Sequence, residues 1–156
     1  EIHGEIDWQR RYKHMKMHTA QHIVSKVVLE EYDATTAGNQ VKADRSRIDF
    51  EPAEFTDEDL KKISEKANEI IHSDIELRKS EVARDKLEEK TEEGRTNLEL
   101  IPGHIDPLRA VEIGDIDICP CGGTHVDATG ELGGIEIVER KSKGADVERI
   151  EFVLTD

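Results

Sequence analysis

Residues 7–32 read DWQRRYKHMKMHTAQHIVSKVVLEEY, and this stretch sets the architecture of the whole chain. It contains neither Gly nor Pro, the two residues that interrupt helices most strongly. Its second half places apolar residues at three- and four-residue steps, which is the spacing of one helix face. We therefore predict a long amphipathic helix. The apolar positions are Ala20, Ile23, Val24, Val27, Val28 and Leu29.

The middle of the chain is predicted to alternate strands and helices. Two short segments, around Val41 and at 48–50, have the composition of strands joined by a polar turn. Thr56 is a typical N-cap residue, and the acidic residues after it favour a helix over 57–72. We also expect a strand near 75–79, followed by a short helix that Ser80 caps and that ends at about Lys90.

The last third of the sequence has the pattern of strands. Residues 91–107 follow neither helix nor strand periodicity, and we expect them to form a surface loop. Beyond them, apolar and polar residues alternate in three segments, with a Gly- and Cys-bearing loop between the first two. The predicted fold class is therefore α+β, an antiparallel sheet with packed helices. The three segments are 108–118, 133–144 and 146–156.

Length and charge exclude several classes of protein. The 156 residues suit one domain, and no apolar run approaches the length of about 18 residues that a spanning helix needs. Lys and Arg number 22 against 36 Asp and Glu, a net charge of −14. Such a balance argues against non-specific binding to membranes or nucleic acids, since both are polyanions. A soluble domain without a membrane partner is expected.

Two short motifs together indicate a metal site. In HTAQH, His18 and His22 lie four residues apart, so a helix would place both on one face. Alone the pair is weak, because His14 continues the same row and a lone histidine pair is more often hydrogen-bonded in a half-buried place. In CPCGGTH, Cys121 and His125 flank two glycines that let a loop turn tightly. Three imidazoles and one thiolate form a ligand set that suits tetrahedral Zn²⁺.

The two cysteines indicate a reducing environment. Cys119 and Cys121 are separated by one residue, which is too short a loop for a stabilising disulfide. A thiol or metal role in a reducing compartment is the better interpretation, and a cytoplasmic location follows. We expect Cys119 to be a structural thiol rather than a ligand.

The motif HTAQH differs from the HExxH motif of zinc proteases. Thr19 stands where those enzymes carry the glutamate that acts as general base. The protease interpretation therefore fails on its key residue, and neither motif offers another carboxylate as base. Activated esters need less help than amides, so this chemistry favours ester substrates.

At HTAQH and CPCGGTH together, the sequence resembles the alanyl-tRNA editing proteins of the AlaX group and the homologous editing domain of alanyl-tRNA synthetase. The editing domain of threonyl-tRNA synthetase is a more distant relative with similar histidine and cysteine spacing. The resemblance extends through DRSRIDF, VEIGDIDICPCGGTHV and KSKG. It implies the editing-domain fold, Zn²⁺ in a cleft, and hydrolysis of the ester that joins a wrong amino acid, serine or glycine, to tRNA(Ala).

The resemblance also implies roles for individual residues. His18, His22, Cys121 and His125 would hold the zinc ion, and Thr19 would lie near the scissile ester, or instead bond a carbonyl of its own helix. We expect Gln21 to lie nearly opposite the ligands around the helix axis. There it would either be exposed to solvent or contact the substrate, and the sequence favours neither.

Around the substrate the sequence departs from the synthetase pattern. That pattern has a glutamine just before a glycine, and this glutamine is thought to hold the substrate. Here Thr36 and Ala37 precede the glycine instead, which puts the amino-acid selectivity in question. Arg47 and Asp49 would shape the pocket floor, or else be exposed charges on an alternating strand.

Contact with mischarged tRNA(Ala) would fall to local basic patches. Arg140, Lys141 and Lys143 follow one another near the end of a predicted strand and would track phosphates, although ordinary surface charge explains each of them nearly as well.

Three arrangements of the chain fit the resemblance. Residues 1–156 would form a single editing domain, with 1–6 the remnant of a linker from an absent N-terminal domain. The chain would be a free-standing editor acting in trans, a longer editor without its first domain, or a synthetase fragment acting in cis. Two other classes remain as alternatives, a non-catalytic zinc-stabilised RNA-binding module and a zinc hydrolase of small esters.

Overall fold

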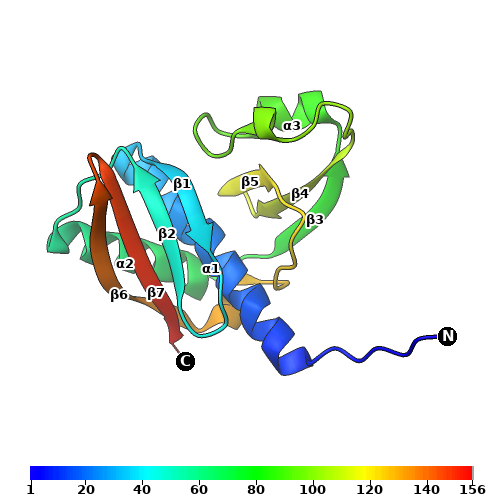
Figure 1. Ribbon diagram of the computed structural model, residues 1–156, viewed down its shortest axis with the longest axis horizontal. Coiled ribbons are helices and arrows are strands. Elements are labelled where there is room, and N and C mark those ends of the chain that lie inside the picture. The colour runs from blue at the N-terminus through cyan, green and yellow to red at the C-terminus, as the bar shows by residue number, and fades with distance from the viewer. Residues whose placement is uncertain (156) are drawn as a thin grey trace.

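A long helix runs through the middle of the molecule between two antiparallel sheets (Figure 1). The computed structural model describes residues 1–155. Helix α1 (Trp8–Tyr32) begins after Asp7, whose carboxylate accepts a hydrogen bond from the Arg10 backbone at 3.1 Å. It ends at Asp33, which adopts a left-handed backbone with φ of 52°. These bounds confirm the predicted helix.

The first sheet has four strands in the order β1-β2-β7-β6. Its inner face packs against α1 and α2 and carries the main hydrophobic core, in which Phe50 and Phe152 are completely buried. Ile48 pairs with Ile150 in the register of β2 and β7, so their buried side chains lie next to each other on this face. The strands are β1 (Thr35–Gln40), β2 (Ser46–Glu51), β6 (Gly134–Gly144) and β7 (Val147–Thr155).

Helix α2 (Asp57–His72) forms as its sequence predicts. The Thr56 hydroxyl accepts from the Asp59 backbone while the Asp59 carboxylate accepts from the Thr56 backbone, a reciprocal capping box. Ile63 and Ile71 lie on its buried face in the main core.

The second sheet has three strands in the order β3-β4-β5. A short helix, α3 (Arg84–Lys90), covers it, and Leu87 of this helix packs with Leu108 and Ala110 in a second, smaller core. The strands are β3 (Leu77–Val82), β4 (Leu108–Ile113) and β5 (Asp117–Pro120).

The structure confirms the α+β class and corrects several boundaries. The strand expected around Val41 lies earlier, at Thr35–Gln40, because pairing with β2 rather than apolar burial defines this polar edge strand. Ser80 does not cap the short helix, since it pairs with Ala110 inside β3, and α3 begins after Ala83. The strands form two sheets rather than one.

Two further segments differ from the prediction. The segment 108–118 is a hairpin, because Gly114 turns the chain with φ of 49° between β4 and β5. Residues 91–107 include a single turn of 3₁₀ helix, Leu98–Leu100, and are otherwise irregular as predicted, yet they also bury the side chain of Arg95. The last residue of the predicted final strand, Asp156, lies outside the described residues. Within 1–155, no helix combines the length and apolar character that crossing a membrane requires.

Candidate metal centre and cleft

Four side chains that are distant in sequence meet beside the middle of α1. His18 and His22 project from one face of the helix, and Cys121 and His125 come from the loop that follows β5. One ligand atom from each residue lies within 4.8 Å of those of the other three. The structure therefore brings together the four residues whose spacing predicts a metal site. We call these four side chains, His18, His22, Cys121 and His125, the metal cluster.

Three distances between ligand atoms of this cluster match those expected around a tetrahedral ion. His18 Nε2 lies 3.3 Å from His22 Nε2 and 3.5 Å from Cys121 Sγ. His125 Nε2 lies 3.4 Å from the same sulfur. Zinc bonds of about 2.0 Å to nitrogen and about 2.3 Å to sulfur place tetrahedral ligands about 3.3–3.6 Å apart. The cluster can therefore hold one metal ion of this size.

Each imidazole directs Nε2 into the cluster and has a partner at Nδ1. The partner is the Thr124 carbonyl for His18 at 3.3 Å and the Thr19 hydroxyl for His125 at 3.0 Å. For His22 it is the Cys119 sulfur, at 3.3 Å. Such partners fix the ring orientation, and each of them can accept a proton from Nδ1 when Nε2 binds a metal.

Burial keeps the imidazoles neutral. It lowers the pKa of His125 to about 3 and the pKa of His22 well below its ordinary value. It lowers the pKa of half-buried His18 in the same direction. Neutral imidazoles are the form that binds metals.

Cys119 belongs to the surroundings of the metal cluster. Burial raises the pKa of its thiol to about 12, so the sulfur stays protonated near His22. Cys119, His22 and Asp117 lie close enough together to form a second possible ligand group. However, both carboxylate oxygens of Asp117 already accept hydrogen bonds from Arg95. These contacts favour the structural role predicted for Cys119.

The ligand loop approaches the helix closely at a glycine. A Cβ atom on Gly123 would lie 2.3 Å from Cε1 of His18, closer than any real side-chain contact, whereas Gly122 faces open space. On the other side of the loop, Arg109 of β4 donates through Nη1 to the carbonyls of Cys121 and Gly123, at 2.8 and 2.6 Å. The loop is thus held between the helix and the second sheet.

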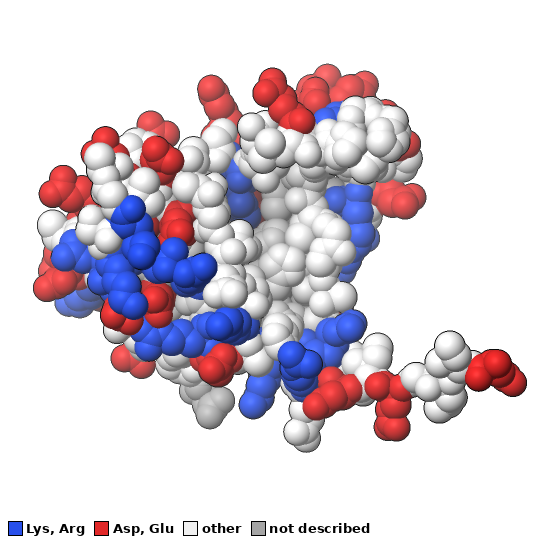
Figure 2. Space-filling view, viewed as in Figure 1, with Lys and Arg blue, Asp and Glu red and all other residues white. Residues whose placement is uncertain are grey.

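The metal cluster borders a cavity of about 610 Å³. His18 and His22 contribute to its lining, and Figure 2 shows the surface hollowed between the two halves of the molecule. The wall is largely polar and comes from α1, β1, β5 and the loop before the 3₁₀ turn. Its other principal residues are Gln21, Thr35, Thr36, Asn39, Arg95, Asn97, Leu100 and Pro120.

Thr36 and Thr19, both expected near a substrate, differ in their access to the cavity. Thr36 lines the cavity, and its hydroxyl donates to Ser25 Oγ at 2.9 Å. Thr19 is completely buried, and its Oγ1 contacts His125 Nδ1 rather than a carbonyl of its own helix.

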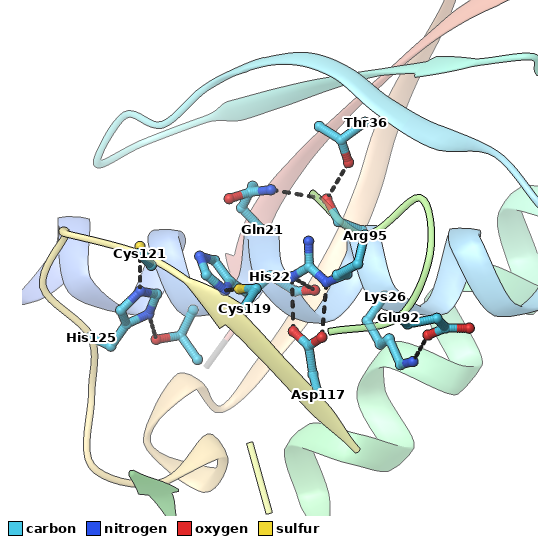
Figure 3. A network of polar contacts seen from close by, with 12 residues as sticks. Gln21, His22, Lys26, Thr36, Glu92, Arg95, Asp117, Cys119, Cys121 and His125 are labelled. Carbon is cyan, nitrogen blue, oxygen red and sulfur yellow. Dashed lines mark hydrogen bonds and ion pairs between the residues drawn. The ribbon is translucent and has the colours of Figure 1, made fainter. Parts of the chain in front are cut away.

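Gln21 was predicted to lie nearly opposite the ligands, and this is wrong. A step of three residues from His18 turns a helix by about 300°, so the two side chains are neighbours around the axis. Gln21 is only 6% exposed, lines the cavity, and donates to Ser25 Oγ at 2.9 Å (Figure 3).

Arg47 and Asp49 are outside the cavity lining. They alternate with the buried residues of β2 and therefore occupy the outer face of the first sheet. Both oxygens of Asp49 accept hydrogen bonds from Arg149, at 2.6 and 2.9 Å, and these bonds lower the pKa of Asp49. The structure thus separates these two residues from the metal cluster.

The three basic residues expected to contact RNA do not share one face. Arg140 pairs with buried Ile150 and donates to the Phe55 carbonyl, on the α2 side of the sheet. Lys141 points to the outer face, 3.3 Å from Glu151, and Lys143 lies near Asp49 of that face. Figure 2 shows Lys and Arg side chains gathered over this part of the first sheet.

Arg95 is a cavity residue that no sequence motif marks. Its side chain is 5% exposed, yet it comes from the irregular segment 91–107 and lines the cavity. A single arginine in a charged loop carries no periodic signal, so only the packing of this segment identifies it.

Part of the chain matches a known family, and nearly all of it matches known relatives. Residues 108–151 match the family described as the threonyl and alanyl tRNA synthetase second additional domain. The matched residues include the loop that carries Cys121 and His125. Over 155 residues the chain is 38% identical to the alanyl-tRNA editing protein AlaX-M of Methanosarcina acetivorans, which covers 99% of this chain and 63% of that protein.

Two other relatives match most or all of this chain with a smaller share of their own length. The AlaX-L editing protein of Pyrococcus horikoshii is 36% identical over 94% of this chain and 35% of its own length. An alanine–tRNA ligase of Sulfurisphaera tokodaii is 34% identical over 100% of this chain and 17% of its own length. The chain is therefore related to the alanyl-tRNA editing proteins and to part of alanine–tRNA ligase, and it spans less than two thirds of the length of each.

Proposed function

We propose that this chain is a zinc-dependent deacylase that hydrolyses the ester of Ser-tRNA(Ala), with Gly-tRNA(Ala) as the second substrate, and that it acts in trans. The observation that carries this proposal is the position of the metal cluster. Two of its histidines line a cavity that is open to solvent, which gives a substrate access to the cluster.

A bound zinc ion would supply a Lewis acid beside the cleft. His18, His22, Cys121 and His125 would hold it, and the Nδ1 contacts would keep the imidazoles in place. The surrounding side chains offer no carboxylate as general base among the described residues that line the cavity. An ester of a ribose hydroxyl is the class of substrate that such a site suits, because it is activated compared with an amide.

The size and lining of the cavity support a small polar substrate group. Its volume of about 610 Å³ falls within the range of ordinary small-molecule sites, about 300–1,000 Å³. Gln21 and Thr36 both donate to Ser25 Oγ, which leaves the Gln21 carbonyl oxygen available to a ligand (Figure 3). An amide oxygen in this position can accept a hydrogen bond from the hydroxyl of an esterified serine.

The outer face of the first sheet supports contact with the RNA. Lys141 and Lys143 of β6 lie on it, together with Arg47 of β2, in a molecule whose net charge is −14. A local basic face is what a strongly acidic protein needs to hold phosphates. Arg140 contributes less to this surface, because it is turned toward Phe55.

The Cys121 ligand requires a thiolate, which suits the reducing cytoplasm where translation takes place.

The test measures loss of label from Ser-tRNA(Ala) by the parent protein and by the His18→Ala and Cys121→Ala variants. We expect rapid release by the parent and almost none by either variant, because each substitution removes one ligand of the metal. His14→Ala is the matched control: His14 lies one turn earlier on the same helix and bonds the Arg10 carbonyl outside the cluster. It should release label at the parent rate.

Absence of release by folded, zinc-loaded parent protein would contradict the proposal. Equal release by the parent and the Cys121→Ala variant would also contradict it, because hydrolysis would then not depend on the metal cluster. A parent that hydrolyses small esters but not Ser-tRNA(Ala) would indicate a different hydrolase.

A further inference from the structure

One cationic side chain is built into the wall of the cleft. Among the described residues that line the cavity, Arg95 alone carries a permanent positive charge, and only 5% of its side chain is exposed. A buried cation is costly unless another charge compensates it. Asp117 of β5 provides that compensation and is itself 2% exposed at the side chain.

The Arg95–Asp117 pair leaves one nitrogen of the guanidinium free. Nε donates to Asp117 Oδ1 at 2.9 Å and Nη2 donates to Oδ2 at 2.8 Å. Nη2 also lies 3.4 Å from the carbonyl oxygen of the metal-cluster residue His22, to which it donates. Within residues 1–155, Nη1 makes no hydrogen bond, and Figure 3 shows it turned away from Asp117 toward Gln21 and Thr36.

This arrangement presents a rigid donor to the cleft. The two-point pairing with Asp117 fixes the plane of the guanidinium, so the direction of the Nη1 hydrogens is fixed as well. The donors meet no protein acceptor and therefore require an oxygen from a ligand or from water. A donor whose direction is fixed in advance is worth most where negative charge develops during a reaction, because it need not reorient at that moment.

We propose that Arg95 is a catalytic residue whose Nη1 donates a hydrogen bond to the carbonyl oxygen of the substrate ester. This inference rests on the proposed deacylation. The carbonyl oxygen is the substrate atom near the metal cluster that gains negative charge, whereas the α-ammonium group of the amino acid would be repelled by the guanidinium.

Arg95 would act while water adds to the ester carbonyl. The oxygen of a water molecule attacks the carbonyl carbon, and the π electrons of the C=O bond move to the carbonyl oxygen, which faces Arg95. When this tetrahedral species collapses, the bond to the ribose oxygen breaks, and that oxygen takes a proton from the attacking water. The products are the free amino acid and a tRNA that ends in a ribose hydroxyl, and Arg95 keeps its protons throughout.

The substitution Arg95→Lys tests this role. A lysine ammonium can still pair with Asp117, but it has no third nitrogen to direct into the cleft. We expect kcat for Ser-tRNA(Ala) to fall about 10²- to 10³-fold, the usual loss when one oxyanion donor is removed. Affinity for a non-hydrolysable, amide-linked seryl-adenosine should change far less than kcat. Zinc content should be unchanged, and Arg78→Lys, a change on the exposed part of β3, is the control.

A second variant guards against misfolding. Arg95→Gln combined with Asp117→Asn removes both buried charges together and leaves an amide pair in their place, so it is expected to show the same loss of kcat. A folded, zinc-loaded variant of either kind that retains the parent kcat would overturn the inference. A loss confined to KM and to analogue affinity would overturn it too. An inactive parent protein would instead refute the proposed deacylation, which separates the two failures.

Discussion

At the scale of single residues, the metal cluster depends on contacts behind the ligands. Three imidazoles direct Nε2 inward because Nδ1 of each meets a different partner, a backbone carbonyl, a thiol or a hydroxyl. The hydroxyl partner, Thr19, is completely buried between His125 and the backbone of Val126, whose N–H also approaches its oxygen at 3.4 Å. We therefore expect Thr19 to position His125.

The substitution Thr19→Val tests this positioning role. Valine keeps the shape of threonine but removes the oxygen, so the Nδ1 proton of His125 loses its acceptor in a buried place. We expect zinc affinity, measured by competition with a chromophoric chelator, to fall about 10- to 100-fold.

Thr19→Ser is the matched control for that experiment, because it retains the hydroxyl. It should bind zinc nearly as tightly as the parent. Equal affinity in the valine variant would show that the contact with His125 does not position the ligand.

At the scale of structural elements, the loop after β5 is shaped by its contact with α1. Gly123 has no room for a side chain, because His18 of the helix lies against its Cα. Arg109 fixes the opposite side of the loop through two carbonyls. Moving the loop away from the helix would disturb these two hydrogen bonds. The close approach to His18, rather than a positive φ, is what favours glycine at this position.

The pair Gly123→Ala and Gly122→Ala tests this constraint with the same chemical change at adjacent positions. A methyl group at Gly123 would displace the His18 ring, so we expect zinc content and deacylation to fall at least tenfold. A methyl group at Gly122 meets open space, and that variant should match the parent. Metal analysis of the two purified proteins gives the comparison, and normal zinc content in Gly123→Ala would contradict the close approach.

At the scale of the whole molecule, the charge is unevenly distributed. Figure 2 shows acidic side chains over much of the surface and basic ones gathered over the first sheet. Lys141 and Lys143 lie on the outer face of that sheet, although Lys141 also pairs with Glu139 and Glu151. Such a surface holds RNA through phosphates and should bind in a strongly salt-dependent manner.

Reversing the charge of Lys141 and Lys143 to Glu tests this surface. We expect the Kd for tRNA(Ala) to rise at least tenfold, and the slope of log K against log salt to decrease by about one for each lysine that contacts a phosphate. Lys61→Glu with Lys86→Glu makes the same change in net charge on exposed parts of α2 and α3. If both double variants bind alike, net charge rather than this face governs the affinity.

The sequence by itself determined the features that depend on neighbours along the chain. The row of His18 and His22 follows from the helical period, and the capping of α2 follows from Thr56 and the acidic residue three positions later. The pairing of HTAQH with CPCGGTH indicated both the metal cluster and the related proteins. Each of these motifs spans only a few residues, so it does not depend on contacts between distant segments.

Other features arise only when the two sheets close around α1. β1 is a polar edge strand whose position depends on its pairing with β2, and Ser80 looks like a helix cap until its pairing with β4 is known. Arg95 is buried because Asp117, 22 residues further along the chain, compensates its charge. Burial, strand register and charge pairing join distant segments, so tertiary packing rather than local sequence turned a loop residue into part of the cleft.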